Sequence, residues 1–242
     1  MKTLVLILHY NTLDLTNSLY ESLDSFQENL YDLFILNNGS DQNHKSEYSS
    51  LYTNKNLYFG GGLNWAFDYV LKNPKYDSLL FLNSDLILEG KNFVKTLRKE
   101  MFDKNFKILS SSILVEAGTP GCKWQQMSNW ESNDTRQVEW IDFQCPMFHI
   151  DFISYIKSFD DDLIYGWGQD SYSGFVCKNK KWKIGVTDKI GVEHLDSVTE
   201  KKTKGKSKFA KLQSEGHIRF LKKNDLVEVD TKLRKNAKRY KF

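Results

Sequence analysis

A single carboxylate interrupts a long apolar stretch in the first half of the chain. Residues 80–88 read Leu-Phe-Leu-Asn-Ser-Asp-Leu-Ile-Leu, so Asp85 follows one hydrophobic run and precedes another. Removing a carboxylate from water is costly unless a partner compensates for the lost hydration. Mg²⁺ or Mn²⁺ is a suitable partner, because such ions bind one or two carboxylates together with phosphate oxygens. The pattern indicates a metal site at Asp85, and the simpler alternative is a solvated turn.

Two more residues have side chains that suit chemistry. Asp170 follows Gly-Trp-Gly-Gln and lies near the start of a predicted helix. A carboxylate there can act as a general base, although it can also serve only as a partner of the helix dipole. His194 ends an apolar run and is either a metal ligand or a structural histidine. The three adjacent carboxylates at 160–162 are better explained as a solvated turn.

The elements that position these residues begin with a βαβ pattern. Apolar runs predict buried strands at 4–8, 33–36 and 79–82, and helical spacing of leucines predicts a helix over 12–29. Each strand ends in a polar cluster: His9-Tyr10-Asn11, then Asn37 to Asp41, then Asn83 to Asp85. In a parallel sheet these clusters share one edge, which is where open α/β folds bind nucleotides.

Three glycines precede another predicted helix. Gly60, Gly61 and Gly62 stand before apolar residues that predict a helix over 63–71. Glycines at a helix start let the backbone approach a phosphate, and the helix N-terminus favours an anion. They do not have the GxGxxG spacing of dinucleotide-binding proteins, and a plain turn is the alternative.

The second half of the chain continues as α/β. The patterns predict helices at 93–101, 152–157 and 169–177, and strands at 108–115, 138–143, 182–186 and 191–194. The loop 116–137 lacks periodicity and carries Trp124 and Trp130. Long loops in compact domains are often functional, so these indoles are expected either to stack an acceptor sugar or to anchor the loop to the core.

Composition and charge favour a single enzyme-sized domain with a basic extension. Residues 199–242 hold 15 Lys and Arg against 5 Asp and Glu, while residues 1–198 hold 19 against 26. We therefore expect a body over 1–198 and a basic, partly helical extension over 199–242 that meets an anionic membrane surface or packs on the body.

The remaining composition indicates where the protein works. The three cysteines are widely spaced, which predicts reduced thiols in a cytoplasmic protein. The apolar run at 4–8 is too short for a signal peptide, and no run approaches the ~20 residues of a membrane span. We expect a cytoplasmic protein that can lie at the inner face of the membrane, with no nucleic-acid partner.

Taken in order, these segments resemble the family 2 glycosyltransferases with the GT-A fold, over residues 1–197. The resembling segments are the opening strand with His9 and Asn11, the Asn37-Asn38 strand end, the glycine-rich segment from Asn56 to Asn64, Asn83-Ser84-Asp85, Gly166-Trp167-Gly168-Gln169-Asp170, and His194. The resemblance implies an α/β fold whose mixed, mostly parallel sheet is flanked by helices.

The resemblance also implies roles for these residues. It places a divalent metal, Mn²⁺ or Mg²⁺, at Asp85 and His194, and it makes Asp170 the base of an inverting transfer. The donor is a UDP-, dTDP- or GDP-sugar, and the acceptor is a glycan or lipid-linked hydroxyl of a surface polysaccharide or lipopolysaccharide. The implied donor contacts are His9, Asn11, Asn37, Asn38, Gly61, Asn64, Asn83 and Ser84, and those with the acceptor are Trp124, Trp130, Trp167, Gly168 and Gln169.

Three departures from the family pattern keep alternatives open. Asn37 stands where an Asp usually contacts the nucleobase, Asn83 replaces the first metal-motif Asp, and Gln169 replaces the Glu before the base. A non-catalytic domain that binds nucleotides or sugars is therefore one alternative. A nucleotidyltransferase is another, although it would need more carboxylates around Asp85.

Overall fold

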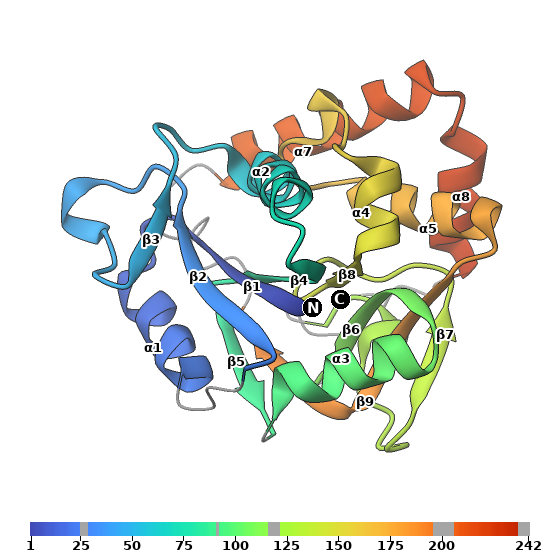
Figure 1. Ribbon diagram of the computed structural model, residues 1–242. Helices are drawn as coiled ribbons and strands as arrows, with labels where there is room; N and C mark the ends of the chain where they lie inside the picture. Colours follow the sequence, from blue (N-terminus) through green and yellow to red (C-terminus); the bar gives the residue numbers. More distant parts are fainter. Residues whose placement is uncertain (25–28, 91, 116–121, 196–205, 237–242) are drawn as a thin grey trace.

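The computed structural model describes residues 1–24, 29–90, 92–115, 122–195 and 206–236. In these ranges nine strands form one sheet with helices on both faces (Figure 1). Helices α2, α4 and α5 cover one face, while α1 and α3 cover the other. This arrangement is the α/β sheet flanked by helices that the sequence predicts.

The first half of the chain builds the parallel side of the sheet. Its elements are β1 (Lys2–His9), α1 (Leu13–Asp24), β2 (Tyr31–Asn37), η1 (Gln42–His44), β3 (Ser49–Tyr52), α2 (Tyr58–Lys72) and β4 (Tyr76–Asn83). Strand β1 lies between β2 and β4 and is parallel to both. Its residues 4–7 are fully buried, as expected of a central parallel strand with both faces covered.

The second half adds antiparallel pairs. Its elements are β5 (Leu86–Glu89), α3 (Phe93–Asp103), β6 (Phe106–Ile113), η2 (Gln125–Met127), β7 (Thr135–Val138), β8 (Met147–His149), α4 (Ile150–Ile156), η3 (Asp161–Leu163), α5 (Gln169–Lys180) and β9 (Lys183–His194). Strand β8 joins the halves, because it is antiparallel to both β4 and β6. The order across the sheet is β3-β2-β1-β4-β8-β6-β9-β5, with β7 on β9.

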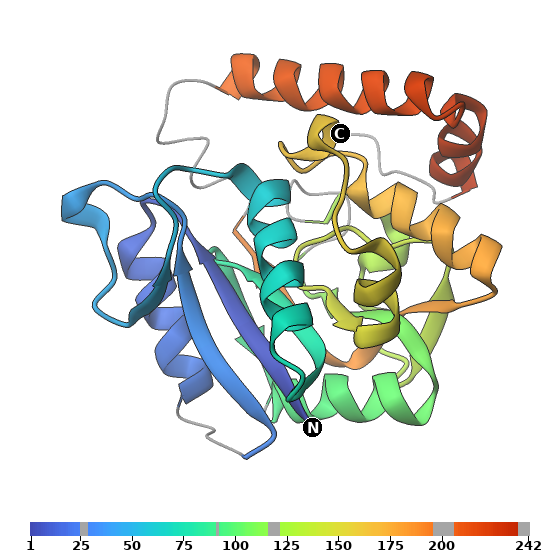
Figure 2. The ribbon, with the colours of Figure 1, turned by 45° about the horizontal axis from the view of Figure 1, so that its top comes forward.

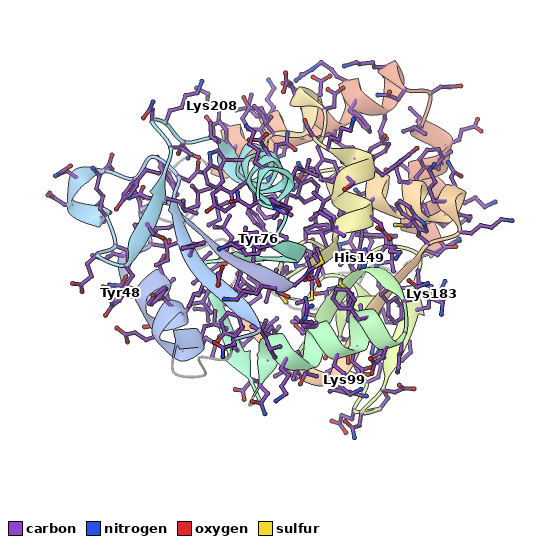
Figure 3. All side chains as sticks on the ribbon, viewed as in Figure 1. Tyr48, Tyr76, Lys99, His149, Lys183 and Lys208 are labelled. Atoms are coloured by element: carbon purple, nitrogen blue, oxygen red, sulfur yellow. The ribbon has the colours of Figure 1, made fainter. Side chains whose placement is uncertain are left out.

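Side chains fill the space between the sheet and its helices (Figure 3). Tyr76 lies in this layer and is 1% exposed, while Lys99 and Lys208 lie at the edge of the molecule. Rings of Phe67, Phe148 and Phe152 pack edge-to-face or stacked between α2, β8 and α4. These rings join α2 and α4 to the sheet.

Four local expectations from the sequence were wrong. The strand predicted at 138–143 is absent, since β7 ends at Val138. The backbone of β4 instead bonds to the Gln144 and Pro146 carbonyls and holds the segment that follows residue 143. Strand β9 is one continuous element rather than two. A short strand, β3, was missed. The three glycines lie inside α2 rather than before it.

The glycines of α2 are explained by packing. A side chain on Gly62 would meet Leu8 Cδ1 at 2.7 Å, and one on Gly60 would meet the Leu163 carbonyl oxygen at 2.5 Å. The helix therefore lies close to β1 and to the η3 segment. Close backbone approach, rather than a phosphate loop, requires glycine at these two positions.

The C-terminal extension packs on the body. It consists of α7 (Lys206–Lys223) and α8 (Val227–Asn236), and α7 crosses the η3 segment while α8 lies against α5 (Figure 2). Phe220 packs on the Tyr172 ring at 5.0 Å, and Leu226 and Leu233 are buried. Arg219 and Lys223 pair with Asp162 and Asp160 at 2.9 and 2.8 Å. The acidic residues at 160–162 thus form ion pairs with basic residues of α7.

Candidate active site

The predicted polar edge of the sheet is present. In the sheet register His9 lies beside Asn37, and Leu8 lies beside Asn83, so the ends of β1, β2 and β4 are aligned. The turn after β4 then leads into β5. This edge carries the residues predicted to bind the donor.

Asp85 and His194 come together because β5 pairs with β9. Leu86 lies opposite His194 in the antiparallel ladder, and the Leu195 N–H donates to the Asp85 carbonyl at 3.0 Å. The side chains meet with His194 Nε2 3.4 Å from Asp85 Oδ1. Both are largely buried, with 11% and 14% of their side-chain areas exposed.

These two side chains are a fitting, incomplete donor set for a divalent ion. A carboxylate oxygen and an imidazole nitrogen suit Mn²⁺, and Mg²⁺ or Mn²⁺ commonly takes its other ligands from water and phosphate. Within the described ranges, no group of three or more His, Cys, Asp or Glu side chains could hold a metal. A metal here would be held by two protein ligands and completed by the donor diphosphate.

Asp142 is a carboxylate that the sequence analysis missed. The Phe81 N–H donates to the Pro146 carbonyl at 3.0 Å and the Asn83 N–H to the Gln144 carbonyl at 3.4 Å, which brings residue 142 beside the end of β4. Burial, and after it the carboxylate of Asp170, raises the pKa of Asp142, while the charges of His194 and Lys123 oppose this. Asp142 interrupts the apolar residues Trp140, Ile141 and Phe143. A carboxylate within an apolar run was also the pattern that indicated a site at Asp85.

Asp170 occupies the second residue of α5. Gly168, at φ +92°, is the N-cap, and this left-handed backbone turns the chain into the helix. The carboxylate is 9% exposed, and its Oδ1 accepts from the Ser171 N–H at 2.8 Å. After burial, the Asp170 carboxylate is the next cause of the raised pKa of Asp142.

A second missed residue, Arg234 of α8, faces Asp170. Its Nη2 lies 3.4 Å from Asp170 Oδ1 and 3.2 Å from the Ser171 hydroxyl, while its Nε donates to Asp230 Oδ2 at 3.0 Å. The Asp230 carboxylate also accepts from Ser171 and lies 3.4 Å from His217 Nε2. Both helices of the extension therefore contribute residues around Asp170: His217 from α7, and Asp230 and Arg234 from α8. No local sequence pattern predicts this contact.

Gln169, predicted to contact the acceptor, lies inside the protein. It is fully buried, and neither its amide nitrogen nor its amide oxygen has a hydrogen-bond partner in the described part of the chain. Gly60 makes room for the amide, because a side chain there would meet Gln169 Nε2 at 2.5 Å. Buried polar atoms are nearly always hydrogen-bonded, so this amide is available for a ligand or a water molecule.

Three of the predicted donor contacts make hydrogen bonds within the protein. His9 Nε2–H donates to the His44 carbonyl at 2.6 Å, which leaves Nδ1 to accept from the Thr16 hydroxyl at 2.7 Å. The Asn38 amide bonds to Leu57, Asn56 and Tyr58, and it thereby holds the start of α2. Asn64 clasps the backbone of Phe159 through both amide atoms, at 2.7 and 2.9 Å.

Other predicted donor contacts keep capacity for a ligand. Asn37 is 2% exposed; its Oδ1 accepts from the Ser40 N–H at 2.9 Å, but among the described residues Nδ2 has no partner. Asn11 reaches the Asp41 carboxylate at 3.0 Å, and the Ser84 hydroxyl bonds to Thr12 at 2.7 Å. Asn83 follows them at the same edge, and Gly61 is half-buried in α2.

The three predicted acceptor tryptophans have different surroundings. Trp124 lies edge-on against the buried Trp140, with 4.7 Å between ring centroids, so it packs on the core. Trp130 and Trp167 are 55% and 47% exposed. Gly168, also predicted here, is closely packed against the ring of His217.

Comparisons with known proteins show the fold. No protein-family model matches the chain, and no curated protein matches its sequence. Three solved structures are similar: A197 from STIV, at TM-score 0.50 and 15% identity over 81% of this chain; GalNAc-T7 with UDP, GalNAc and Mn²⁺, at 0.60 and 13% over 80%; and S. aureus TarS 1–349, at 0.55 and 16% over 79%. The aligned parts cover 86%, 44% and 59% of those chains, so this chain matches less than two thirds of GalNAc-T7 and of TarS. The chain thus has a GT-A fold of the kind that glycosyltransferases use.

Proposed function

We propose that the protein is a metal-dependent inverting glycosyltransferase that uses a nucleotide-sugar donor. The observation that carries this proposal is the buried Asp85 and His194 pair beyond the carboxyl ends of the strands in a GT-A fold, and the proposed base is Asp170 at the start of α5. The similar structure that contains UDP, GalNAc and Mn²⁺ supports the same class of donor and ion.

The donor lies along the edge formed by β1, β2 and β4 in this proposal. The nucleobase lies near Asn37, whose free Nδ2 would donate to an acceptor atom of the base, and UDP-, dTDP- and GDP-sugars all carry such atoms. The diphosphate lies toward Asp85 and His194, where a bound ion would neutralise the charge that develops on the leaving group.

Transfer then requires one base. Asp170 takes the proton from an acceptor hydroxyl as its oxygen attacks the anomeric carbon, and the bond from that carbon to the diphosphate breaks with its electrons. A single displacement inverts the configuration and needs no covalent intermediate. Arg234 holds the Asp170 carboxylate from the side of α8. The acceptor is a glycan or glycolipid hydroxyl, as in polysaccharide or lipopolysaccharide synthesis.

Calorimetry with UDP, dTDP and GDP, each with and without Mn²⁺, tests the donor site. The wild type is expected to bind one of them more tightly with Mn²⁺. Asp85→Ala should lose the metal-dependent part, and His194→Ala should lose less of it. Asp68→Ala, which removes an exposed carboxylate of α2, is the matched control. Equal Mn²⁺-dependent affinity in the wild type and Asp85→Ala would overturn the metal assignment.

A cytoplasmic location at an anionic membrane surface also remains a proposal. Within the described ranges, every helix is too short or too polar to cross a bilayer. The apolar face of α7 packs on the body through Phe209 and Phe220, so attachment would rest on charge from exposed residues such as Lys211 and Lys222. Failure to sediment with anionic liposomes at low salt would exclude it.

A further inference from the structure

A second site lies next to the candidate active site. A cleft of about 350 Å³, open to solvent, lies among the η2 turn, the end of β7 and the end of α8. Its walls include Gln126, Trp130, Glu139, Trp140 and Asn236. None of these residues belongs to the Asp85 and His194 pair, so the cleft is distinct from the candidate metal site.

Trp130 presents a fixed aromatic surface in this cleft. The ring is 55% exposed, and the Arg136 guanidinium lies over it at 4.1 Å from the centroid. The fully buried Asp188 side chain pairs with Arg136 and also accepts from the Trp130 N–H at 3.3 Å. Arg136 donates in addition to the Gln126 and Ser128 carbonyls, at 2.9 and 2.6 Å. An exposed indole held by so many bonds is a preorganised platform rather than a loose surface residue.

Buried polar groups without partners border the cleft. In the described part of the chain, the Gln126 amide nitrogen and oxygen and the Trp140 Nε1–H have no hydrogen-bond partner. Trp140 is fully buried, so its unpaired N–H is costly unless a ligand or water satisfies it. Glu139 and Asn236 are joined by a bond of 3.3 Å, and Glu139 is also 3.7 Å from Lys178.

This chemistry selects a neutral sugar. A pyranose has an apolar face that stacks on an indole and hydroxyls that pair with amides, N–H groups and a carboxylate. The Arg136 guanidinium over the Trp130 ring is already paired with Asp188, whereas the Glu139 carboxylate lines the cleft and would repel an anionic sugar. We infer that the cleft is a binding site for a neutral glycan and that α8 completes it through Asn236.

The cleft connects to Asp170 through one shared wall. The Arg234 guanidinium lies 5.3 Å from the Trp140 ring, and the same group reaches Asp170 at 3.4 Å. A glycan bound in the cleft would thus have its next residues beside the proposed base. This inference rests on the proposed function only in making that glycan the acceptor; the binding site itself stands on the cleft.

Binding of defined trisaccharides tests the inference. The probes are neutral trisaccharides of glucose, galactose and mannose, with the trisaccharide of galacturonic acid as the anionic comparison. Saturation-transfer NMR and tryptophan fluorescence should detect at least one neutral probe and not the anionic one. Trp130→Ala should weaken that binding about tenfold, because one stacked ring is lost, while Trp130→Phe should restore most of it.

Tyr155→Ala is the matched control, since Tyr155 is 51% exposed on α4 and is not among the cleft residues. Circular dichroism and the melting temperature check that each variant is folded. If Trp130→Ala unfolds, Gln126→Ala takes its place, with the same loss expected.

Each outcome has one meaning for the cleft. Unchanged binding in the folded Trp130 and Gln126 variants, or equal binding of the anionic trisaccharide, overturns the inference, as does the absence of binding by every neutral probe. Nucleoside diphosphate binding is measured in the same samples. If the protein binds a nucleoside diphosphate but no glycan, the proposed function stands and the glycan site is overturned. If it binds a glycan but no nucleoside diphosphate, the glycan site stands and the proposed transferase function is overturned.

Discussion

The proposed donor side and the proposed acceptor side of this protein differ in how their polar groups are paired. On the donor side, His9, Asn38 and Asn64 use their hydrogen-bonding atoms within the protein, and only Asn37 keeps a buried amide nitrogen unpaired in the described chain. On the acceptor side, Gln169, Gln126 and Trp140 all hold buried polar atoms without partners in the same ranges.

Charge shows the same difference. The acceptor side gathers Asp142, Asp170 and Asp230 around Arg234, and burial followed by the Asp170 carboxylate raises the pKa of Asp142. Unpaired polar atoms and adjacent like charges each lower the stability of a fold. Their concentration on one side indicates that the donor edge is a rigid support and that the chemistry lies around α5 and α8.

The largest expected effect is at Asp170. Asp170→Asn keeps the shape of the side chain but removes the basic oxygen, so the turnover number should fall by about 10²–10⁴-fold while donor binding is unchanged. The measurement is release of nucleoside diphosphate from a panel of nucleotide-sugars, with calorimetry for the donor. Asp68→Asn, an exposed carboxylate paired with Lys72, is the control.

The competing explanation for Asp170 is a purely structural one. A residue that only partners the helix dipole contributes about 0.3–1 kcal/mol, so its loss would lower the melting temperature slightly. Near-normal turnover in a slightly destabilised Asp170→Asn protein would remove Asp170 from the mechanism and leave the acceptor side without a base.

A smaller effect is expected at Arg234. Arg234→Ala removes the cation that faces Asp170, Ser171 and Asp230, so kcat should fall about tenfold, the net strength of one charge-assisted hydrogen bond, while donor affinity stays the same. Arg234→Lys keeps the charge without the fork and should recover part of the loss. Added guanidinium should partly rescue Arg234→Ala.

Arg219→Ala is the matched control for Arg234, because it removes an arginine that pairs with Asp162 from the same extension. If both variants lose stability equally and neither loses turnover, the extension is only a structural cover. In that case the comparison between the two sides would no longer include the C-terminal helices.

The sequence was sufficient wherever local patterns determine structure. Buried strands such as 4–8 and the polar residues at their ends were predictable, because continuous apolar runs and turn residues act locally. The meeting of Asp85 with His194 required the resemblance, since it depends on β5 pairing with β9 across more than a hundred residues. The glycines of α2 misled because close packing and phosphate binding both demand glycine.

Long-range packing explains what the sequence did not reveal. The sequence left open whether the basic extension meets an anionic surface or packs on the body. Its partners on the body are Asp160, Asp162 and Asp170, which no spacing rule connects to it. Asp142 was hidden in a predicted strand that the pairing of β4 with residues 144–147 replaces. Its carboxylate offers the finest test of the difference between the two sides.

Asp142→Asn is expected to stabilise the protein. Burial, followed by the Asp170 carboxylate, raises the pKa of Asp142 above its ordinary value of 3.8. The folded state then binds the proton more tightly than the unfolded state, so stability falls as pH rises above 3.8 and the carboxyl ionises. The variant lacks this penalty, and its melting temperature should exceed that of the wild type by about 2–4 °C for each kcal/mol regained.

The pH dependence makes the test specific to the charge. The gain should be small near pH 3.8 and should grow toward neutral pH, whereas a packing effect would be constant across the range. Asp134→Asn is the control, because the pKa of that exposed carboxyl is lowered by Lys104 and its loss should not stabilise. A stabilised Asp142→Asn protein with reduced turnover would show that the acceptor side keeps this carboxylate for function. If Asp142→Asn is as stable as the wild type at pH 7, the buried Asp142 carboxylate does not destabilise the fold. The two sides of the protein would then not differ in the energetic effect of their charges.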